Sequence, residues 1–262
     1  MTVSADLRDA SADVRVAQRT RAVLIALTMP DDAGAIGRAL ALGFAQRGWD
    51  VAIAASMEPP GANADAHDAA RAAASIAAEV ESLGRRAAAL AADFAAEHDV
   101  ARLVDACGAA LGRPSCVIVQ AAGRADNARD IGYASLAETI AREVAAPLVL
   151  ARALAAATPE AARDDERERA VVIHLLDETV FHPAPERLSH SLAQAALHRA
   201  TAAQALALAP KVRVVGLVRG RAPRVDEIAD AACYLAEASG VTGATLTIDG
   251  GEHLEPTAGG KN

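Results

Sequence analysis

Two polar side chains share one face of a segment with the pattern of an amphipathic helix. In "LSHSLAQAAL", residues 188–197, His190 and Gln194 stand four positions apart, so a helix places them one above the other. An imidazole with a reference pKa of about 6.5 can donate a proton near neutral pH. A glutamine amide can hydrogen-bond a hydroxyl group but carries no charge. The segment therefore has the residue types for acid–base chemistry on a bound molecule.

A second candidate site follows the first apolar run, in "TMPDDAGAIGRALALGF". Gly34 and Gly37 stand at the start of a helical pattern, where backbone amides and the helix dipole can hold a pyrophosphate. Met29 replaces the usual turn glycine, and Asp31 and Asp32 would repel phosphate unless they point away. The turn permits dinucleotide binding, and an ordinary strand-to-helix turn is the alternative.

The next strand-like run ends at Ser56, in "AASMEPP". A serine there offers neither the carboxylate that binds a ribose 2′-hydroxyl nor the arginine that binds a 2′-phosphate. If a cofactor is bound, it could be NADP or NAD.

Short apolar runs alternate with longer segments of helical period, the pattern of β–α–β units. Right-handed crossovers would place helices on both faces of a parallel sheet. We therefore expect an α/β fold, a single-domain Rossmann-like doubly wound sheet of about seven strands. Residues 21–254 would form the domain, with 1–20 as a flexible arm and 255–262 as a flexible tail. The expected strands are "AVLIAL", "DVAIAA", "RAAALA", "SCVIVQ", "AVVIHLL", "KVRVVGL" and "ATLTID".

The composition argues against several classes of function. With 26 basic and 34 acidic residues, the net charge of −8 opposes binding to nucleic acid or to an anionic membrane. No apolar run is long enough to span a membrane, and the polar N-terminus lacks a secretion signal, so we expect a cytoplasmic protein. Cys107, Cys116 and Cys233 lack metal-ligand spacing and are expected to be reduced packing residues.

Five landmarks, in order, resemble the short-chain dehydrogenase/reductase (SDR) family from Ala22 to His253. They are the turn at 28–37, "AADF", "QAAG", the "LSHSLAQAAL" helix and "VTGATLTIDGG", of which the last is the most specific. The resemblance implies an oxidoreductase fold, an NADP or NAD cofactor, no metal and a small-molecule substrate or ligand. Asp93 and Phe94 would flank the adenine, and residues 120–123 would run under a ribose. The positions implied to bind the cofactor are Thr28, Gly34, Ile36, Gly37, Ser56, Asp93, Phe94, Gln120, Ala121, Ala122 and Gly123.

The same resemblance locates the catalytic positions. The family uses a Tyr, a Lys four residues later and a Ser, or in pteridine reductases an Asp, thirteen residues before the Tyr. Here these places hold His190, Gln194 and Asp177, and the segment "FHPAPERLSHSLAQAAL" looks most like pteridine and dihydromonapterin reductases. An Asn of the family's proton relay falls at Glu143. The usual lid over the substrate is nearly deleted, because "LVRG" leads through "RAPRVD" to "EIAD", with Arg219 at the usual Pro.

Two functional hypotheses follow. In the first, the chain is a pseudoenzyme that keeps the fold and serves as a structural or ligand-binding subunit, because the Tyr, the Lys, the relay Asn and the lid are all lost. In the second, it is an active NAD(P)H-dependent oxidoreductase in which His190 donates the proton and Asp177 raises the pKa of the imidazole. A metal site through His182, His190, His198 and His253 is disfavoured, since Gln194 is a poor zinc ligand.

Oligomerisation is also implied by the resemblance. The terminal segment and the helices starting near Ser135 and Leu188 would pack against their copies to form a homo-oligomer, a dimer or tetramer. A heteromer with an active relative is the alternative.

Overall fold

The computed structural model describes residues 21–28, 33–57, 65–121, 123, 125–222 and 224–254. The expected arm at 1–20, the expected tail at 255–262 and Ala122 lie outside the described residues.

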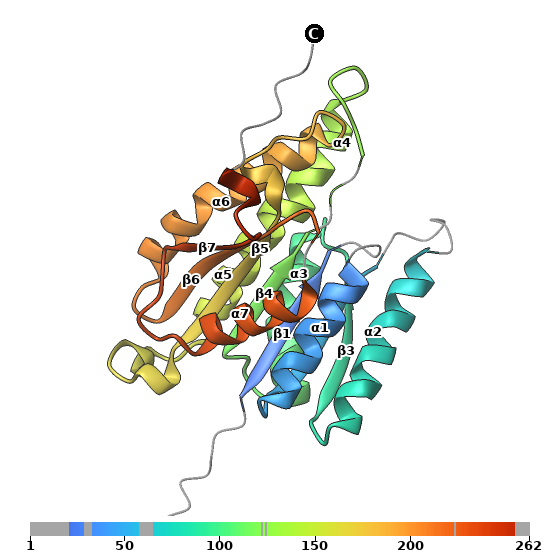
Figure 1. The fold of residues 1–262 in the computed structure, drawn as a ribbon. Helices are drawn as coiled ribbons and strands as arrows, with labels where there is room; N and C mark the ends of the chain where they lie inside the picture. Colours follow the sequence, from blue (N-terminus) through green and yellow to red (C-terminus); the bar gives the residue numbers. More distant parts are fainter. Residues whose placement is uncertain are drawn as a thin grey trace, which may run out of the picture.

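A seven-stranded, wholly parallel sheet runs through the molecule in the order β3-β2-β1-β4-β5-β6-β7, as Figure 1 shows. The strand order reverses between β1 and β4, which makes their carboxyl ends the topological switch point. The expected α/β class and strand number are confirmed. The strands are β1 (Ala22–Leu27), β2 (Asp50–Ser56), β3 (Ala87–Ala92), β4 (Cys116–Gln120), β5 (Ala170–Leu176), β6 (Val212–Arg219) and β7 (Thr245–Ile248).

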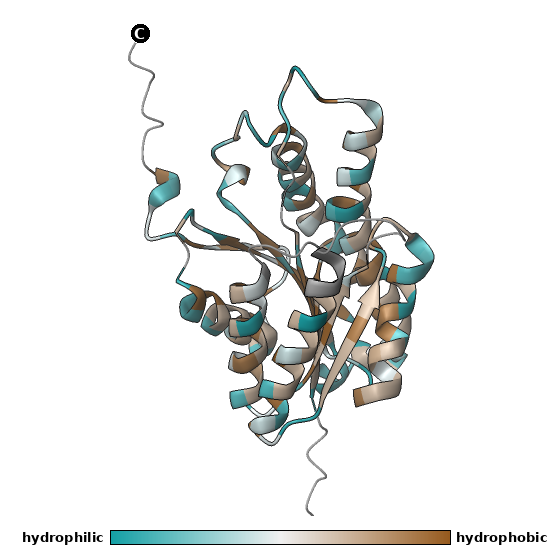
Figure 2. Ribbon diagram, turned by 90° about the vertical axis from the view of Figure 1, so that its right-hand side faces the viewer, coloured by the Kyte–Doolittle hydropathy of each residue, from teal (hydrophilic) through white to brown (hydrophobic). Residues whose placement is uncertain are grey.

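Helices cover both faces of the sheet. One face carries α1 (Ala33–Gln46), α2 (Asp65–Ser82) and α7 (Val225–Glu237), and the other carries α3 (Glu97–Leu111), α5 (Ala146–Ala157) and α6 (Leu188–Leu208). Figure 2 shows mostly apolar strands between helices in which hydrophilic and hydrophobic residues are mixed. The five inner strands β1, β2, β4, β5 and β6 are buried along their whole length, which explains their continuous apolar runs.

The helix after β4 is interrupted. Between α4 (Tyr133–Ile140) and α5 lies a π-helical turn, Ala141–Ala145. Pro147 follows in the first turn of α5 and has no N–H to donate to the carbonyl four residues earlier. A local change of hydrogen-bond pattern is therefore favoured here, and it sets the directions of Arg142 and Glu143.

The connection between β6 and α7 and the three cysteines are as the sequence indicated. Only residues 220–224 join β6 to α7, so the connection is as short as the sequence indicated. Cys107, Cys116 and Cys233 are buried free thiols. Among the described residues, no helix has the length and apolar character needed to cross a membrane.

Candidate functional site

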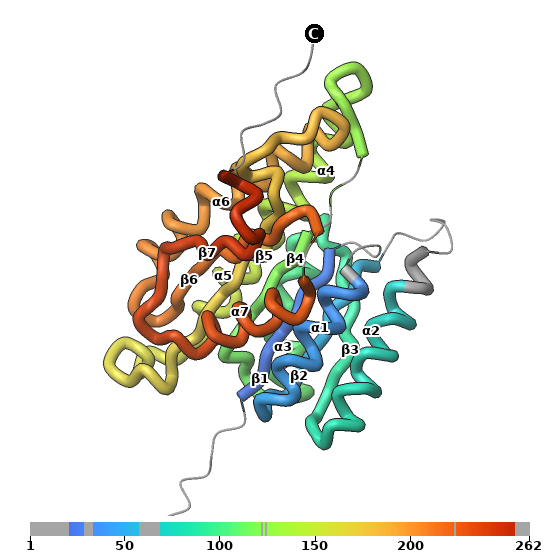
Figure 3. The backbone as a smooth tube through the Cα atoms, viewed as in Figure 1, coloured from blue at the N-terminus to red at the C-terminus, as the bar shows by residue number. Residues whose placement is uncertain are grey.

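The candidate site lies where the carboxyl ends of β1, β4 and β5 meet the first turns of α6. The amide of Thr28, just after β1, donates to the carbonyl of Gln120 at the end of β4 (3.0 Å). Asp177 follows β5, and His190 and Gln194 lie on the buried face of α6. In Figure 3, the segments around α4 and α6 run side by side beyond this end of the sheet, and the two helices are in contact. Packing of α6 against the π turn brings Glu143 to the same point.

His190 lies between two carboxylates. Its Nε2 is 2.8 Å from Asp177 Oδ2 and its Nδ1 is 2.6 Å from Glu143 Oε2. The three residues are 0%, 2% and 3% exposed, respectively. The structure thus brings together the expected catalytic positions 177 and 190 with the relay position 143. Both ring nitrogens are occupied by protein groups.

The two carboxylates keep this imidazole charged. Burial lowers the pKa of His190, but the hydrogen bonds to Asp177 and Glu143 outweigh it and raise the pKa to about 9. Burial also opposes the charge of Asp177, yet the hydrogen bond to His190 holds its pKa well below the usual range. At neutral pH His190 is therefore an imidazolium paired with the Asp177 carboxylate.

Further groups stabilise the Asp177 carboxylate. The hydroxyl of Thr179 donates to Oδ1 (2.5 Å), and its backbone N–H donates to the same oxygen (3.0 Å). The guanidinium groups of Arg187 and Arg219 lie 3.5 and 3.8 Å from Oδ2. Gln194 Oε1 accepts from the backbone N–H of Asp177 (3.1 Å), which fixes the orientation of the Gln194 amide.

Gly123 leaves room for the imidazole. A Cβ added at this position would lie 2.2 Å from His190 Cγ and 2.4 Å from Nδ1, well inside van der Waals contact. The segment after β4 therefore packs directly on the ring. Gly123, which was expected to contact the cofactor, packs its backbone against the ring of His190, where a side chain would not fit.

Four polar side-chain atoms around the switch point have no hydrogen-bond partner within the described part of the chain. They are Thr28 Oγ1, both amide atoms of Gln120 and Gln194 Nε2, and all are buried. Leaving such atoms unsatisfied costs free energy, so a bound molecule that supplies both donors and acceptors would be stabilised here. Hydroxyl groups of a nucleotide ribose have this chemistry, and the residues fit that part of a cofactor.

The other expected cofactor residues are distributed over several elements. Gly34, Ile36 and Gly37 lie in α1, and a Cβ at Gly37 would lie 2.8 Å from Leu27 Cδ1, so this glycine allows α1 to pack on β1. The side chain of Phe94 is buried in the core, which leaves only its backbone to face a ligand. Ala121 is buried, and Met29–Asp32 lie outside the described residues.

Ser56 and Asp93 meet at an arginine that the sequence interpretation did not include. Arg142 Nη1 donates to Ser56 Oγ (3.2 Å), and Arg142 Nη2 lies 3.2 Å from Asp93 Oδ1. The run "AREVAAP" offered a signal for this residue, because Arg142 directly precedes Glu143 in an otherwise apolar stretch. The directions of the two side chains depend on the π turn.

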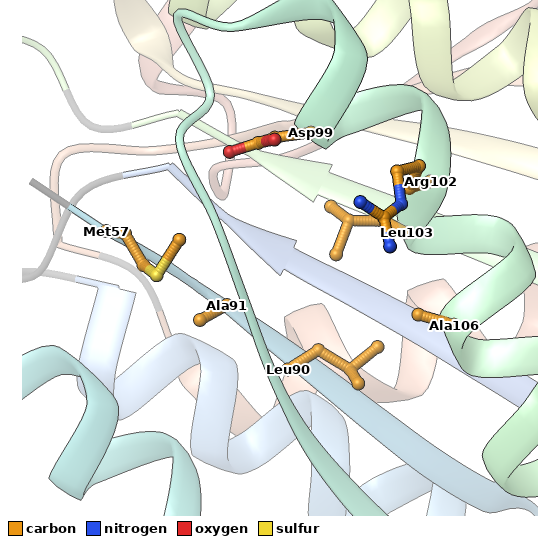
Figure 4. Close-up of a pocket in the computed structure, with 7 residues that line it drawn as sticks. All are labelled: Met57, Leu90, Ala91, Asp99, Arg102, Leu103 and Ala106. Atoms are coloured by element: carbon orange, nitrogen blue, oxygen red, sulfur yellow. The ribbon is translucent and has the colours of Figure 1, made fainter.

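A pocket of about 260 Å³ lies beside this group, between α3 and the ends of β2 and β3. Figure 4 shows Met57, Leu90 and Ala91 facing side chains of α3 across the space. The amide of Asp93 donates to Asp99 on the rim (3.4 Å), so the pocket adjoins the expected adenine end of the site. The α3 residues that line it are Asp99, Arg102, Leu103 and Ala106.

A displaced Tyr or Lys does not complete the site within the described residues. The only tyrosines in the sequence, Tyr133 and Tyr234, are 97% and 60% exposed. Lys211, which precedes the amino end of β6, binds Glu160 (2.7 Å) at the opposite edge of the sheet. The other lysine, Lys261, lies outside the described residues.

In the part of the chain that the structure describes, no group of three or more His, Cys, Asp or Glu side chains is arranged so that it could hold a metal ion. His253 lies 2.7 Å from Asp249, and His198 contacts the ring of Phe181. His190 is separate from both, because its nitrogens bind carboxylates.

Comparison with known proteins adds the following. The family model of short chain dehydrogenases matches residues 31–222. No curated protein sequence matches the chain. Among solved structures, FolM alternative dihydrofolate reductase 1 from Brucella canis, complexed with NADP, is 25% identical; the match covers 91% of this chain and 96% of that one, with a TM-score of 0.75.

Two more structures show the same fold. FolM alternative dihydrofolate reductase 1 from Brucella suis, in complex with NADP, is 26% identical over 90% of this chain and 96% of its own, with a TM-score of 0.74. Acetoin dehydrogenase YohF from Salmonella typhimurium is 22% identical over 90% and 98% of the two chains, with a TM-score of 0.75.

Proposed function

Because the chain belongs to the short-chain dehydrogenase family, we propose that it binds a nicotinamide nucleotide without catalysing the family's usual carbonyl or pterin reduction. It would serve as a structural or ligand-binding subunit. One observation carries the proposal: His190, at the position of the proton donor, is fully buried and both of its ring nitrogens bind carboxylates.

A proton donor must reach the reacting atom within hydrogen-bonding distance. To do so, His190 would have to break its bond to Asp177 or to Glu143. The carboxyl group that it leaves would then remain buried without its partner. Breaking a buried pair of this kind costs about 3–5 kcal/mol. That free energy would add to the barrier of every turnover, which argues against proton donation from this residue.

The substrate side of the site gives independent support. With only residues 220–224 between β6 and α7, little chain is present to cover a substrate. Exclusion of water strengthens the electrostatic interactions of a hydride-transfer site. A substrate site that little chain covers, next to a proton donor that the substrate cannot reach, is poorly suited to the reduction of a carbonyl group or a pterin.

Nucleotide binding is supported by the unpartnered atoms at the switch point. Thr28, Gln120 and Gln194 would hold the ribose and amide portions of the nucleotide by neutral hydrogen bonds. A bound nicotinamide supplies hydride transfer in this family. The two FolM structures, with about a quarter of their residues identical to this chain, are NADP complexes, which makes NADP the first nucleotide to test.

A second candidate function follows from the charge of His190. With a pKa of about 9, the imidazole holds a proton at neutral pH, next to Asp177. If the cluster opened on substrate binding, His190 would be the donor in an active NAD(P)H-dependent oxidoreductase.

One experiment separates the two. The cofactor-stripped protein is titrated with NADPH and NADH by calorimetry and nicotinamide fluorescence, and oxidation of each nucleotide is then followed with pterins, ketones and enones. We expect binding without turnover. Turnover that His190→Phe abolishes, while the exposed-site control His98→Phe retains it, would establish the active enzyme instead. If neither nucleotide binds, the ligand-binding role is wrong.

We also propose that the protein is a homo-oligomer. Leu192 and Leu206, on the outer face of α6, are 50% and 84% exposed, and Tyr133 at the start of α4 is 97% exposed. Apolar residues on neighbouring helices favour association. A mixed assembly with an active relative is the alternative, and a cytoplasmic location stays a prediction.

A further inference from the structure

Arg142 joins the ends of two strands to the helix that follows β4. Its guanidinium donates through Nη1 to Ser56 Oγ (3.2 Å) and through Nε to Glu138 Oε1 (3.3 Å), and Nη2 lies 3.2 Å from Asp93 Oδ1. The side chain is only 11% exposed. A cation is therefore held in one place beside the carboxyl end of β2.

The π turn gives Arg142 this direction. Consecutive residues of the turn serve different parts of the site, because Glu143 binds His190 whereas Arg142 reaches Ser56 and Asp93. Single π turns within α-helices occur frequently at functional sites. The π turn thus supplies one charged side chain to the His190 cluster and another to the ends of β2 and β3.

In doubly wound folds that bind dinucleotides, residues at the end of β2 contact the adenosine ribose of the nucleotide. A carboxylate there binds the 2′-hydroxyl of the adenosine ribose, whereas a nearby arginine accommodates the 2′-phosphate of NADP. Ser56 occupies this position, and the segments 28–32 and 57–64 that follow β1 and β2 contain no lysine or arginine. A cation for a 2′-phosphate would therefore have to come from another element.

We propose that Arg142 and Ser56 together bind the 2′-phosphate of NADP and make the chain select NADP over NAD; this rests on the nucleotide binding proposed above. A guanidinium and a hydroxyl can both donate to phosphate oxygens, and the planar guanidinium can donate to two at once. A serine in place of a carboxylate removes the repulsion that would exclude the phosphate.

The carboxylates of Asp93 and Glu138 are compatible with this role. Their side chains are 34% and 47% exposed, and the contacts each makes with Arg142 at 3.2–3.3 Å use one oxygen. Each can release Arg142 when a phosphate dianion approaches, and Asp93 Oδ1 can then keep its bond from the backbone N–H of Ala95 (2.9 Å). Without the nucleotide, they hold the guanidinium in position, which limits the entropy lost on binding.

The test is calorimetric titration of the wild type, Arg142→Gln and Arg38→Gln with NADPH and NADH. Arg38 is the matched control, because it pairs with Glu79 across the exposed surfaces of α1 and α2. We expect wild type and Arg38→Gln to bind NADPH at least about tenfold more tightly than NADH, since charge-assisted hydrogen bonds are lost with NADH. Arg142→Gln should bind the two nucleotides equally.

Three results would overturn the assignment: equal affinities in the wild type, an unchanged preference in Arg142→Gln, or tighter binding of both nucleotides by that variant. The last result would mean that the Arg142 side chain blocks the site. Failure of the wild type to bind either nucleotide would contradict the proposed function as well, so the two failures are distinguishable.

A second measurement needs no variant. Adenosine 2′,5′-bisphosphate and adenosine 5′-monophosphate differ only in the 2′-phosphate, so their affinities for the wild type isolate its contribution. We expect the bisphosphate to bind at least about tenfold more tightly, with a difference that shrinks as salt is added. Equal affinities at low salt would contradict the role of Arg142.

Discussion

At the scale of single residues, the most informative feature is the buried imidazolium of His190 between two carboxyl groups. The position that the family resemblance assigns to the tyrosine holds His190, and Asp177 and Glu143 bind both sides of its ring. The position that the resemblance assigns to the lysine holds Gln194, whose Oε1 accepts from the backbone N–H of Asp177 just after β5. Glu143, His190, Asp177 and Gln194 form one connected hydrogen-bonded cluster.

The charge of His190 predicts how stability depends on pH. Its folded pKa is raised from 6.5 to about 9, so its contribution is complete below pH 6.5 and is lost as the pH rises through 9. The shift corresponds to about 3 kcal/mol of unfolding free energy. Urea unfolding between pH 6 and 10 should show this decline in wild type and in His98→Gln. A decline of the same size in His190→Gln would show that another group causes it.

The contact between Gly123 and His190 predicts coupling between two substitutions. Gly123→Ala places a methyl group against the buried ring and should destabilise the protein by about 1–3 kcal/mol. In the background of His190→Ala, where the ring is absent, the same change should cost much less. A double-mutant cycle by urea unfolding measures the difference. Additive effects would mean that the segment moves away from the ring at little cost.

At the scale of elements, two local devices determine where the site residues point. The π turn between α4 and α5 directs Arg142 and Glu143 into different parts of the site. The start of α6 is bound by a residue from a distant loop: the backbone N–H of Ser189 donates to Asp126 Oδ1 (3.0 Å), and the Ser189 hydroxyl bonds Oδ2 of the same carboxylate. A carboxylate at a helix N-terminus satisfies amides that have no partner within the helix.

The contribution of this cap can be measured. Asp126→Ala removes the acceptor for the α6 amide and should lower the unfolding free energy by about 0.5–2 kcal/mol. Because α6 carries Gln194, which is proposed to bind the nucleotide, the substitution should also weaken nucleotide binding. Asp130→Ala, in the same loop but bonded to Asn127, is the control for both measurements. Equal stability of the two variants would mean that the cap contributes nothing.

At the scale of the whole molecule, the sheet places every candidate group at one end, and the outer face of α6 is available for association. Leu192 and Leu206 project from this face amid alanines, including Ala195, Ala196 and Ala203, that are also exposed. Burial of such a surface against a second copy would remove apolar area from water.

The proposed assembly predicts a specific change in mass. Introducing Leu192→Glu and Leu206→Glu together would bring four carboxylates into a two-fold interface and should dissociate a dimer or tetramer, as measured by light scattering. The folded monomer should keep its circular dichroism spectrum. Leu83→Glu, at an exposed position just after α2 and outside the proposed interface, should leave the mass unchanged. A monomeric wild type would refute the proposed homo-oligomer.

The sequence by itself determined the architecture, and it indicated three side chains that the structure brings together, Asp177, His190 and Gln194. Continuous apolar runs such as "AVLIAL" and "AVVIHLL" form inner strands because a parallel sheet covered on both faces buries every side chain. Asp177, His190 and Gln194 lie together as their spacing predicted, because the lengths of the strand and the helix determine which residues meet at the end of β5. Local pattern was sufficient for these features.

Tertiary structure decided the partners of these residues. Glu143, Asp177 and His190 come from three different elements, and their contacts depend on how α6 packs on the π turn. The same holds for Arg142, whose bond to Ser56 spans distant parts of the chain and needed a helix irregularity that no periodic pattern specifies. Charge on a side chain is visible in the sequence, but its direction and its pKa are properties of the neighbours that folding brings to it.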